Sequence, residues 1–389
     1  MRDKYLPYGL HWIDEDDIQE VLKVLRSDWI TQGPKVKEFE EKLANYCGAK
    51  YAVTVSSGTA ALHLACLALD VEPGDEVITS PITFLATSNS VLYCGGKPVF
   101  VDIDEKTYNI DGNKIEEKIN KNTKGIIPVD FAGQPCDLDR IREIANKYNL
   151  WVIEDATHAL GAEYNGKKIG GLSDLTIFSF HPVKAITTGE GGAIATNNSV
   201  LYERLLMLRS HGVTKDSSKF ETENAKLEGG QWYYEMQELG YNYRITDFQC
   251  ALGISQLKKL DKFIERRREI VQIYNEAFKN IEEVIIPYEK PNVKSACHLY
   301  VLQIDFEKIG KTRKELFDYM RENNILLQVH YIPVYLQPYY QQLGYKEGIC
   351  PNAEDFYQRE ISLPLYPSMR NRDVKYIINA ILKYLEELI

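Results

Sequence analysis

Short apolar strands alternate with helical segments through the first 155 residues of the chain. Runs rich in β-branched residues predict strands at 51–55, 76–79, 98–103, 125–129 and 151–154. Apolar residues at helical spacing predict helices between them, at 59–69, 84–93, 115–119 and 138–148. This alternation predicts an α/β fold whose mainly parallel central sheet is flanked by helices on both faces. Because ligands of such sheets bind beyond the carboxyl ends of the strands, the residues that follow each strand are the first candidates for a site.

The rest of the chain extends this sheet and then begins a second unit. Helices are expected at 14–26 and at 36–46, the second stopped by Gly48. Strands at 175–180 and 192–196 flank a glycine-rich loop, and a helical region runs from about 246 to 279. A strand at 298–304, a helix at 313–322, a strand at 326–330 and a helix at 374–388 predict a smaller C-terminal α+β domain. We therefore expect a large domain, 1–285, and a small domain, 286–389.

The charge balance narrows the class of partner. The chain has 46 Lys and Arg residues against 56 Asp and Glu, and this net charge of −10 argues against nucleic acid as the main partner. No run of about 18 apolar residues predicts a membrane span, and no signal sequence is expected at the N-terminus. The seven cysteines are scattered without a Cys-x-x-Cys pair. We expect a cytoplasmic enzyme with reduced thiols and no metal site.

A lysine lies in the glycine-rich loop between the strands at 175–180 and 192–196. The loop reads SFHPVKAITTGEGG from Ser179 to Gly192, with Lys184 at its sixth position. Most lysines are solvated, and position alone favours that interpretation. The neighbours favour a second one, because Ser179 and a glycine-rich backbone can bind an anion such as phosphate. A lysine in a dry pocket also loses its charge more easily and can form a Schiff base.

An acidic residue follows the strand at 151–154. The segment reads VIEDATH from Val152 to His158, and Asp155 lies at the carboxyl edge of the sheet. It is either the cap of the next turn or a carboxylate held opposite a cationic ring nitrogen, as pyridoxal phosphate chemistry requires. His158 is placed to contact the same ring. A metal site is the weaker alternative, since no further ligand follows at the right spacing.

Small residues join the strand at 51–55 to the following helix. The segment reads SSGTAA from Ser56 to Ala61, so Gly58 and Thr59 open a helix whose free N–H groups can bind phosphate. The same residues also make an ordinary helix cap, and they do not form a P-loop. Phe84 opens the next helix and either stacks on a flat ring or belongs to the core. An anion cradle, an aromatic face, an acid and a lysine together match what pyridoxal 5′-phosphate requires.

These motifs resemble the DegT-type sugar-nucleotide aminotransferases of fold type I. The resemblance covers nearly the whole chain, from ITQGP at 30–34 through the lysine and acid motifs to GYNYR at 240–244. It implies the pyridoxal phosphate-dependent transferase fold, in which Lys184 holds the cofactor covalently and shuttles a proton. It implies that Asp155 pairs with the pyridine nitrogen, His158 lies near the phenolic oxygen and Phe84 stacks on the ring. The phosphate is expected at Gly58, Thr59 and Ser179, with Asn242 from a partner subunit, so the site lies in a homodimer.

A narrower resemblance concerns the pseudaminic acid branch of this family. It depends on RSHG at 209–212, VHYIPVY at 329–335, AEDFY at 353–357 and ISLP at 361–364. It implies transfer of an amino group from L-glutamate, leaving 2-oxoglutarate, to C4 of a UDP-linked 4-keto-6-deoxy-N-acetylhexosamine. The residues expected to bind this substrate are Arg209, His211 and Arg244 at the diphosphate, and His330 and Tyr331 at the sugar or nucleotide.

Two alternatives concern the substrate site. A half-buried edge is an equally good interpretation of His330 and Tyr331. Another nucleotide-linked keto-sugar is the alternative substrate. A dehydratase relative would carry histidine in place of Lys184, and a non-catalytic sensor usually carries an attached DNA-binding segment, so both are disfavoured. The polar stretch at 217–231 is expected to be a loop, and the insert at 221–237 matches no family motif.

Overall fold

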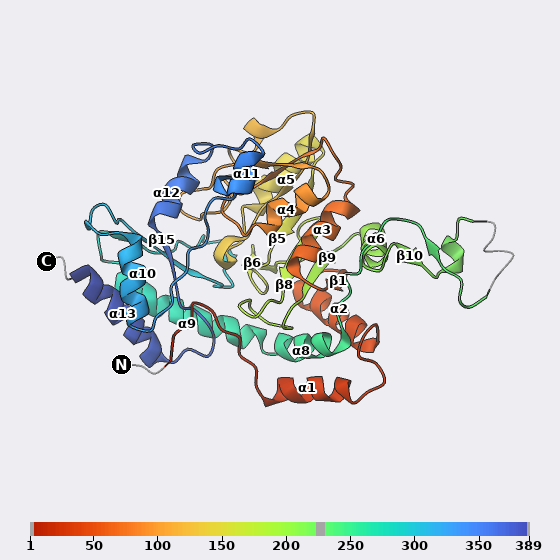
Figure 1. The fold of residues 1–389 in the computed structure, drawn as a ribbon, viewed down its shortest axis with the longest axis horizontal. Helices are drawn as coiled ribbons and strands as arrows, with labels where there is room; N and C mark the ends of the chain where they lie inside the picture. Colours follow the sequence, from red (N-terminus) through yellow and green to blue (C-terminus); the bar gives the residue numbers. More distant parts are fainter. Residues whose placement is uncertain (1–3, 223–229, 387–389) are drawn as a thin grey trace.

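The central layer is a seven-stranded sheet, seen in a computed structural model that describes residues 4–222 and 230–386 (Figure 1). The strand order is β1-β9-β8-β5-β4-β2-β3. The strands are β1 (Tyr51–Val55), β2 (Glu76–Thr79), β3 (Lys97–Phe100), β4 (Thr123–Ile127), β5 (Trp151–Asp155), β8 (Leu175–Ser179) and β9 (Gly192–Thr196). Only β9 runs antiparallel to its neighbours, β1 and β8. The predicted mainly parallel α/β sheet is therefore confirmed.

Helices cover both faces of this sheet because its strands are apolar on both sides. Phe178 and Ile177 are consecutive in β8, and their side chains enter different buried clusters on opposite faces. One cluster contains residues of α2 (Pro34–Cys47), α5 (Leu138–Tyr148) and α8 (Asp247–Leu257). The other contains residues of α3 (Gly58–Ala68), α4 (Ala86–Tyr93) and α6 (Ser199–Arg209).

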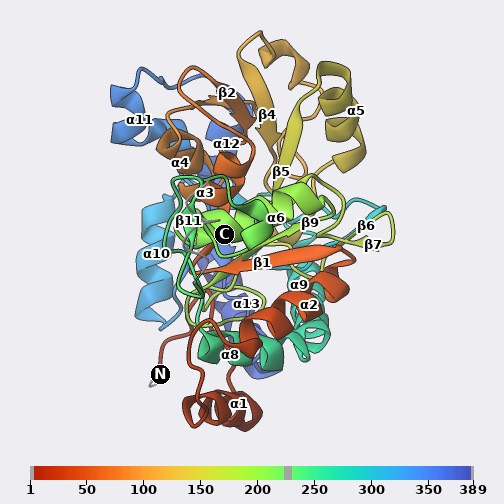
Figure 2. The same cartoon turned by 90° about the vertical axis from the view of Figure 1, so that its right-hand side faces the viewer.

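The first helix, α1 (Glu15–Leu25), lies beside α8, as Figures 1 and 2 show. Asp17 of α1 is buried against α8, and Gln256 of α8 donates a hydrogen bond of 2.7 Å to its Oδ2. Nζ of Lys259, which follows α8, lies 3.0 Å from Oδ1 of Asp17. A polar anchor thus fixes this otherwise peripheral helix.

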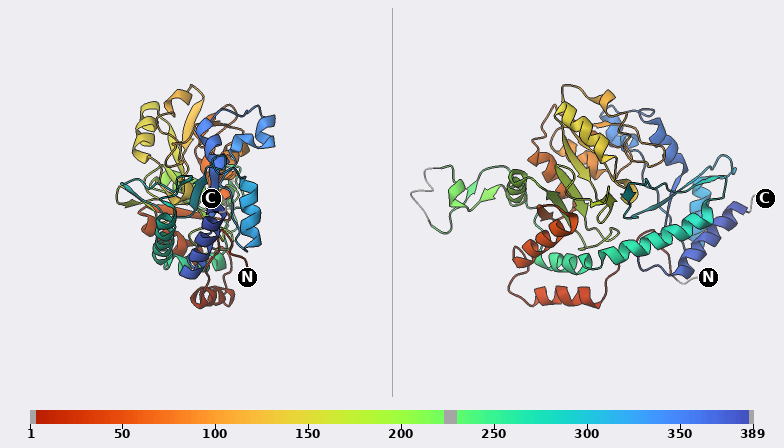
Figure 3. Two further views of the ribbon diagram at one scale, coloured as in Figure 1. Left: turned by 90° about the vertical axis from the view of Figure 1, so that its left-hand side faces the viewer. Right: turned by 180° about the vertical axis from the view of Figure 1, so that it is seen from behind.

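The helical region expected at 246–279 is two helices. The first, α8, ends at Leu257, and α9 (Leu260–Phe278) follows after a break at 258–259 (Figure 3, right). The residues of α9 that pack in the C-terminal cluster include Ile270, Tyr274 and Phe278. The same cluster contains Leu6, so the N-terminal segment also packs on the C-terminal part of the chain.

The C-terminal part is an α+β unit. Its sheet has the antiparallel order β12 (Val284–Ile285), β14 (Tyr300–Ile304) and β15 (Glu360–Leu363). Its helices are α10 (Arg313–Glu322), α11 (Pro338–Gln342), α12 (Pro351–Arg359) and α13 (Asn371–Glu386). The end of the last predicted helix, at residue 388, lies outside the described residues.

The strand predicted at 326–330 is wrong. The segment is extended, but only isolated bridges form, between Leu6 and Ile325 and between Gln328 and Ser362. The ladder stops there because the N–H of His330 donates to the carboxylate of Glu360 instead of a backbone carbonyl. The helix predicted at 115–119 is also shorter than expected, a single 3-10 turn at Glu116–Lys118.

The remaining elements are short. A small antiparallel sheet contains β6 (Glu163–Tyr164), β7 (Lys167–Lys168) and β13 (Val293–Lys294). A hairpin of β10 (Val213–Thr214) and β11 (Glu235–Met236) projects from the body of the molecule (Figures 1 and 3). Part of the loop predicted at 217–231, residues 223–229, lies outside the described residues. In the described part of the chain, no helix is long and apolar enough to span a membrane.

Candidate active site

A cavity of about 500 Å³ opens at the carboxyl edge of the central sheet. It collects residues that follow β1, β5 and β8, as expected for a parallel sheet. It also receives the segment at 328–331 from the C-terminal unit. The sequence-predicted residues that line it are Gly58, Thr59, Phe84, Asp155, Ser179, Lys184, His330 and Tyr331. The lining residues that the sequence did not single out are Tyr8, Ser57, Leu62, Ala86, Thr87, Thr157, His181, Val183, Glu190, Gln328 and Val329.

Lys184 reaches this cavity from the loop between β8 and β9. Its backbone N–H donates to the carbonyl oxygen of His181 at 2.9 Å, which closes a turn and holds the loop. Burial lowers the pKa of Lys184 to about 8, although the negative charge of Asp155 acts in the opposite direction. Among the described residues, no carboxylate forms an ion pair with its ammonium group. Lys184 is therefore not the solvated lysine of the alternative interpretation, and near neutral pH its amine is neutral in a far larger fraction than that of an ordinary lysine.

Asp155 ends β5 with its side chain buried. Its Oδ2 accepts a hydrogen bond of 2.6 Å from the hydroxyl of Thr87, and its Oδ1 accepts one of 3.2 Å from the N–H of Thr157. The second bond is the turn cap that the sequence left open as an alternative. The first comes from α4, and it fixes the carboxylate toward the cavity. Thr87 is a residue that sequence reasoning missed.

The N-terminus of α3 forms a narrow cradle beside Ser179. Ser57 caps the helix, its Oγ accepting from the N–H of Ala60 at 3.0 Å. A Cβ at Gly58 would lie 3.0 Å from Cβ of Ser179, and one at Gly192 would lie 2.5 Å from the carbonyl oxygen of Ser57. The backbone is thus packed so closely that only glycine fits at Gly192, and the first N–H groups of α3 face the cavity edge. This is a suitable place for a phosphate group.

Phe84 is not a core residue. Its side chain is 59% exposed and lines the cavity, with its ring centre 6.3 Å from that of Tyr331. An exposed phenylalanine in a cavity offers an aromatic face to a flat ligand.

His158 lies behind the cavity wall. Its Nε2 lies 3.3 Å from the hydroxyl of Tyr331, and its ring centre lies 4.3 Å from that of His298. Burial, together with the charge of Lys184, holds the pKa of His158 well below its ordinary value, so the ring is neutral. Its buried Nδ1 has no hydrogen-bond partner among the described residues. His298 was not identified from the sequence.

Besides His158, four predicted residues do not line this chain's cavity. Arg209 was expected at a diphosphate, but its Nη1 lies 2.5 Å from Oε1 of Glu40 and 2.7 Å from the carbonyl oxygen of Thr54. This nitrogen of the guanidinium is thus engaged by an internal ion pair, and the role of Arg209 at a diphosphate stays a prediction. His211 and Asn242 are exposed and Arg244 is half-buried, none of them at this cavity. Asn242 was assigned to a partner subunit, so its role stays a prediction.

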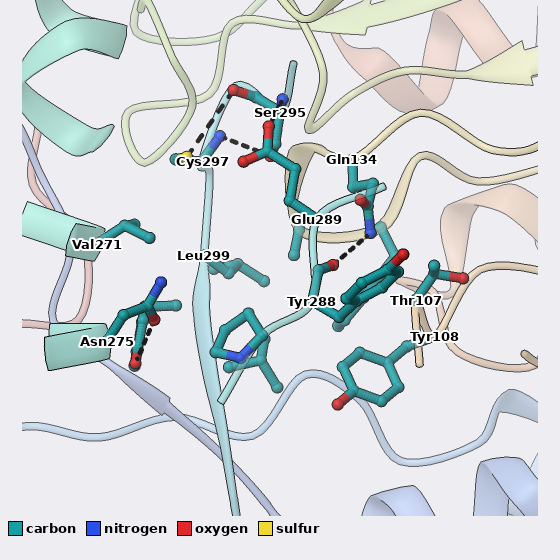
Figure 4. Close-up of a pocket in the computed structure, with 15 residues that line it drawn as sticks. Thr107, Tyr108, Gln134, Val271, Asn275, Tyr288, Glu289, Ser295, Cys297 and Leu299 are labelled. Atoms are coloured by element: carbon teal, nitrogen blue, oxygen red, sulfur yellow. Dashed lines mark hydrogen bonds between the residues drawn. The ribbon is translucent and has the colours of Figure 1, made fainter. Parts of the chain in front are cut away.

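A second cavity, of about 80 Å³, lies between α9 and the chain around residues 287–301 (Figure 4). The side chains of Tyr108, Tyr288 and Leu299 line it, and Gln134 donates to the carbonyl oxygen of Tyr288 at 3.0 Å. It is too small for a cofactor, and it contains no lysine.

The comparisons with known proteins agree with this geometry. Residues 11–382 match the model of the DegT/DnrJ/EryC1/StrS aminotransferase family. The chain belongs to this family. As a member it is an aminotransferase that uses pyridoxal 5′-phosphate, which confirms the predicted cofactor and enzyme class.

Two relatives and two solved structures illustrate the similarity. The spore coat polysaccharide biosynthesis protein SpsC of Bacillus subtilis is 46% identical over 382 residues, covering 98% of this chain and 97% of that protein. A UDP-4-amino-4,6-dideoxy-N-acetyl-beta-L-altrosamine transaminase of Campylobacter jejuni is 41% identical over 386 residues, covering 98% of each chain. PseC of Helicobacter pylori, an aminotransferase of pseudaminic acid biosynthesis, superimposes with a TM-score of 0.90 at 35% identity, over 99% of this chain and 100% of its own. The PLP form of the putative sugar aminotransferase Spr1654 of Streptococcus pneumoniae does so with a TM-score of 0.90 at 32% identity, over 99% and 100%.

The residues of this DegT-family member fit the cofactor. The cradle at Gly58 suits its phosphate, the carboxylate of Asp155 suits its ring nitrogen, and the exposed ring of Phe84 suits its flat face. Lys184 supplies an amine of lowered pKa in the same cavity.

Proposed function

We propose that this aminotransferase moves an amino group from L-glutamate to C4 of a UDP-linked 4-keto-6-deoxy-N-acetylhexosamine, in pseudaminic acid biosynthesis. The observation that carries the proposal is the placement of Lys184 and Asp155 in one cavity that residues of the C-terminal unit also line. The similarity along the full chain to a transaminase named for a 4-amino-4,6-dideoxy sugar supports the choice of substrate.

Each residue of the cavity has a role in this proposal. Lys184 would hold the cofactor covalently, and Asp155 would accept a hydrogen bond from its ring nitrogen. Phe84 would contact the ring face, while Gly58, Thr59 and Ser179 would bind the phosphate. When bound, pyridoxal phosphate supplies an electron sink for the carbon that loses its proton.

Lys184 would also move the proton. In the first half of the reaction its neutral Nζ would take the proton from Cα of glutamate. In the second half it delivers a proton to C4 of the sugar, which then carries the amino group. A lowered pKa suits both steps, because the amine accepts and donates near neutral pH. His158, neutral and next to Tyr331, would contact the phenolic oxygen of the cofactor.

A homodimer completes the proposal. The projecting hairpin and the chain around it expose large apolar side chains, with Trp232 and Leu239 both 74% exposed and Met236 61% exposed. Exposed apolar groups of this size indicate a protein interface. Asn242 lies exposed at the base of this segment, where it would reach the phosphate of a second subunit. His211 and Arg244, also outside the cavity of their own chain, would contact the diphosphate in the dimer.

A second candidate is amination of another nucleotide-linked keto-sugar by the same residues. The greater identity to a spore coat polysaccharide protein than to the altrosamine transaminase favours keeping it. The two candidates share every step at Lys184 and differ only in the sugar that the outer cavity accepts.

The test uses the purified enzyme loaded with pyridoxal phosphate. It is incubated with L-glutamate and with UDP-4-keto-6-deoxy-N-acetylhexosamines of both C5 configurations, and mass spectrometry follows the products. We expect a UDP-amino sugar and 2-oxoglutarate in equal amounts from one of them. Lys184→Ala should form neither, whereas Lys167→Ala, a change at an exposed lysine, should behave as the wild type. Amination of neither sugar would refute the proposed substrate, and loss of the sugar hydroxyl without 2-oxoglutarate would indicate a dehydratase.

A further inference from the structure

A buried carboxyl group lies behind the His330 wall of the active-site cavity. Glu360 begins β15 and is fully buried. Its Oε2 accepts a hydrogen bond of 2.9 Å from the backbone N–H of His330. Its Oε1 lies 2.7 Å from Oγ of Ser362, and that Oγ lies 2.8 Å from Nδ1 of His330. The three side chains therefore form one continuous chain of hydrogen bonds from the C-terminal sheet to the cavity.

The strand β15 places these groups by its alternation. Glu360 and Ser362 are two residues apart, so their side chains lie on the same face of the strand. Ile361 and Leu363, between and after them, point into the hydrophobic cluster of the C-terminal unit. Glu360 and Ser362 therefore lie on the opposite face of the strand, and a carboxyl group buried there is costly unless it is hydrogen-bonded, as both oxygens of Glu360 are.

The hydrogen bonds that link Glu360, Ser362 and His330 can run in two directions. The His330 N–H always donates to Oε2, so only Oε1 can change its role. When Glu360 is ionised, Ser362 donates to Oε1 and must accept from Nδ1–H of His330, which leaves Nε2 of the ring as an acceptor. When Glu360 is protonated, Oε1–H donates to Ser362, Ser362 donates to Nδ1, and the ring carries its proton on Nε2.

We propose that Glu360 and Ser362 are positioning residues that determine whether Nε2 of His330 accepts or donates a hydrogen bond at the active-site cavity. The role of that hydrogen bond rests on the proposed function: Nε2 would face a hydroxyl or carbonyl oxygen of the keto-sugar. One proton taken up at Nε2 is balanced by the transfer of Nδ1–H to Ser362 and of the Ser362 hydroxyl proton to Oε1. No other reactant is needed.

The electrostatic surroundings keep His330 neutral throughout. Burial and the charge of Lys184 lower the pKa of His330 to about 3, so its ring changes tautomer without becoming an imidazolium. Burial raises the pKa of Glu360 to about 8, against the opposing effects of the hydrogen bonds from Ser362 and the His330 N–H and of the charge of Arg313. The ring of Tyr8 lies 5.2 Å from that of His330.

Three more titratable groups face His330. Tyr331, the next residue, is buried with a raised pKa, and its hydroxyl is un-ionised. His158 lies beside the Tyr331 hydroxyl and His298 beside His158, and both are neutral because burial lowers their pKa values. Glu360 and Lys184 are thus the groups around His330 whose charges change near neutral pH. In the holoenzyme the proposed covalent link of Lys184 to the cofactor removes its titration, which leaves Glu360 as the titrating group on this hydrogen-bond chain.

The test reads the tautomer of His330 directly in the holoenzyme. The protein has seven histidines, so labelling them with ¹⁵N and comparing His330→Gln assigns the two ring nitrogens by NMR. Between about pH 6 and about pH 10 we expect the proton to move from Nε2 to Nδ1, with its midpoint near the pKa of Glu360. Because this titration needs no variant of Glu360 or Ser362, it does not depend on their folding.

Two variants and one control complete the design. In Glu360→Gln the carbonyl oxygen is held by the His330 N–H, so the amide donates to Ser362 and should keep the proton on Nε2 at every pH. Ser362→Ala should abolish the pH dependence. The control Ser295→Ala removes another buried hydroxyl of the same unit, which accepts from the N–H of Cys297 at 3.0 Å, and should leave the titration unchanged.

The proposal would be overturned if the His330 tautomer of the wild type stays constant over this range. It would also be overturned if the tautomer still changes with pH in Ser362→Ala. The measurement requires no sugar, so failure of the proposed substrate leaves its result intact. If the tautomer changes as proposed and the keto-sugar is the substrate, Glu360→Gln should also flatten the pH profile of kcat/KM for the keto-sugar.

Discussion

The hydroxyl of Thr87 lies 2.6 Å from Oδ2 of Asp155 and donates a hydrogen bond to it. Thr87 in turn lies 2.7 Å from the hydroxyl of Thr83. A charge-assisted bond of this length orients the carboxylate that we assign to the cofactor's ring nitrogen. The first turn of α4 therefore helps to set the direction of the acid at the end of β5.

Replacing Thr87 tests this orientation. Thr87→Val keeps the shape and removes the hydroxyl, and hydrogen bonds to charged groups contribute about 1.5–3 kcal/mol. We expect kcat to fall about tenfold or more, since each 1.4 kcal/mol is a factor of about ten in rate. Thr87→Ser retains the hydroxyl and should keep most of the activity. Equal activity of the Val and Ser variants in a steady-state assay would show that the bond does not matter.

The pH dependence of cofactor capture follows from the lowered pKa of Lys184. Only the neutral amine attacks an aldehyde, so the rate at which apo-enzyme binds pyridoxal phosphate covalently should rise with pH and level off above about 8. Asp155 favours the charged amine, so Asp155→Asn should move the midpoint to lower pH. Stopped-flow absorbance measures both curves. A midpoint near 10.5, the ordinary value for lysine, would contradict the desolvated position of the Lys184 amine in this half-buried loop.

The glycines of the phosphate cradle should differ in their tolerance of a methyl group. Gly192→Ala would bring a Cβ to 2.5 Å from the backbone oxygen of Ser57, which cannot move aside, so this variant should lose cofactor binding and stability. Gly58→Ala would meet Ser179 at 3.0 Å and should weaken cofactor binding to a smaller extent. Gly112→Ala is the control, because it meets only the flexible side chain of Arg140. Fluorescence titration with the cofactor and thermal unfolding would rank the three.

Arg209 should contribute to stability more than to substrate binding. It forms a largely buried ion pair with Glu40, and removing one partner of such a pair costs about 3–5 kcal/mol. Arg209→Ala should therefore lower the free energy of unfolding by several times more than Lys97→Ala, which breaks an exposed pair with Glu76. Denaturant unfolding measures both. A raised KM for the sugar nucleotide with unchanged stability would favour the role first expected from the sequence.

Much of the fold was predictable because local signals and tertiary structure agree. The strand Tyr51–Val55 and the helices Leu138–Tyr148 and Arg313–Glu322 have the predicted bounds, since their apolar periodicity matches the surfaces that they bury. The segment at 326–330 reads as a strand by composition, but the Glu360 carboxylate takes the N–H that would continue the ladder.

The residues of the candidate site were predictable only where a local sequence motif contains them. Lys184, Asp155 and Gly58 stand next to strands and glycines, so their position in the cavity follows from the sheet. Thr87 is separated from Asp155 by 68 residues, and nothing in the local sequence around either one pairs them. Glu360 looks like one of many surface acids, and only the packing of β15 against His330 reveals that it is buried.

Every step of the proposed function depends on Lys184 as the residue that carries the cofactor. Borohydride reduction of the loaded enzyme fixes the cofactor to whichever amine holds it, and peptide mass spectrometry then identifies the residue. We expect a single modified peptide with the pyridoxyl group on Lys184. A cofactor fixed on any other lysine, or a protein that binds no cofactor covalently, would contradict it.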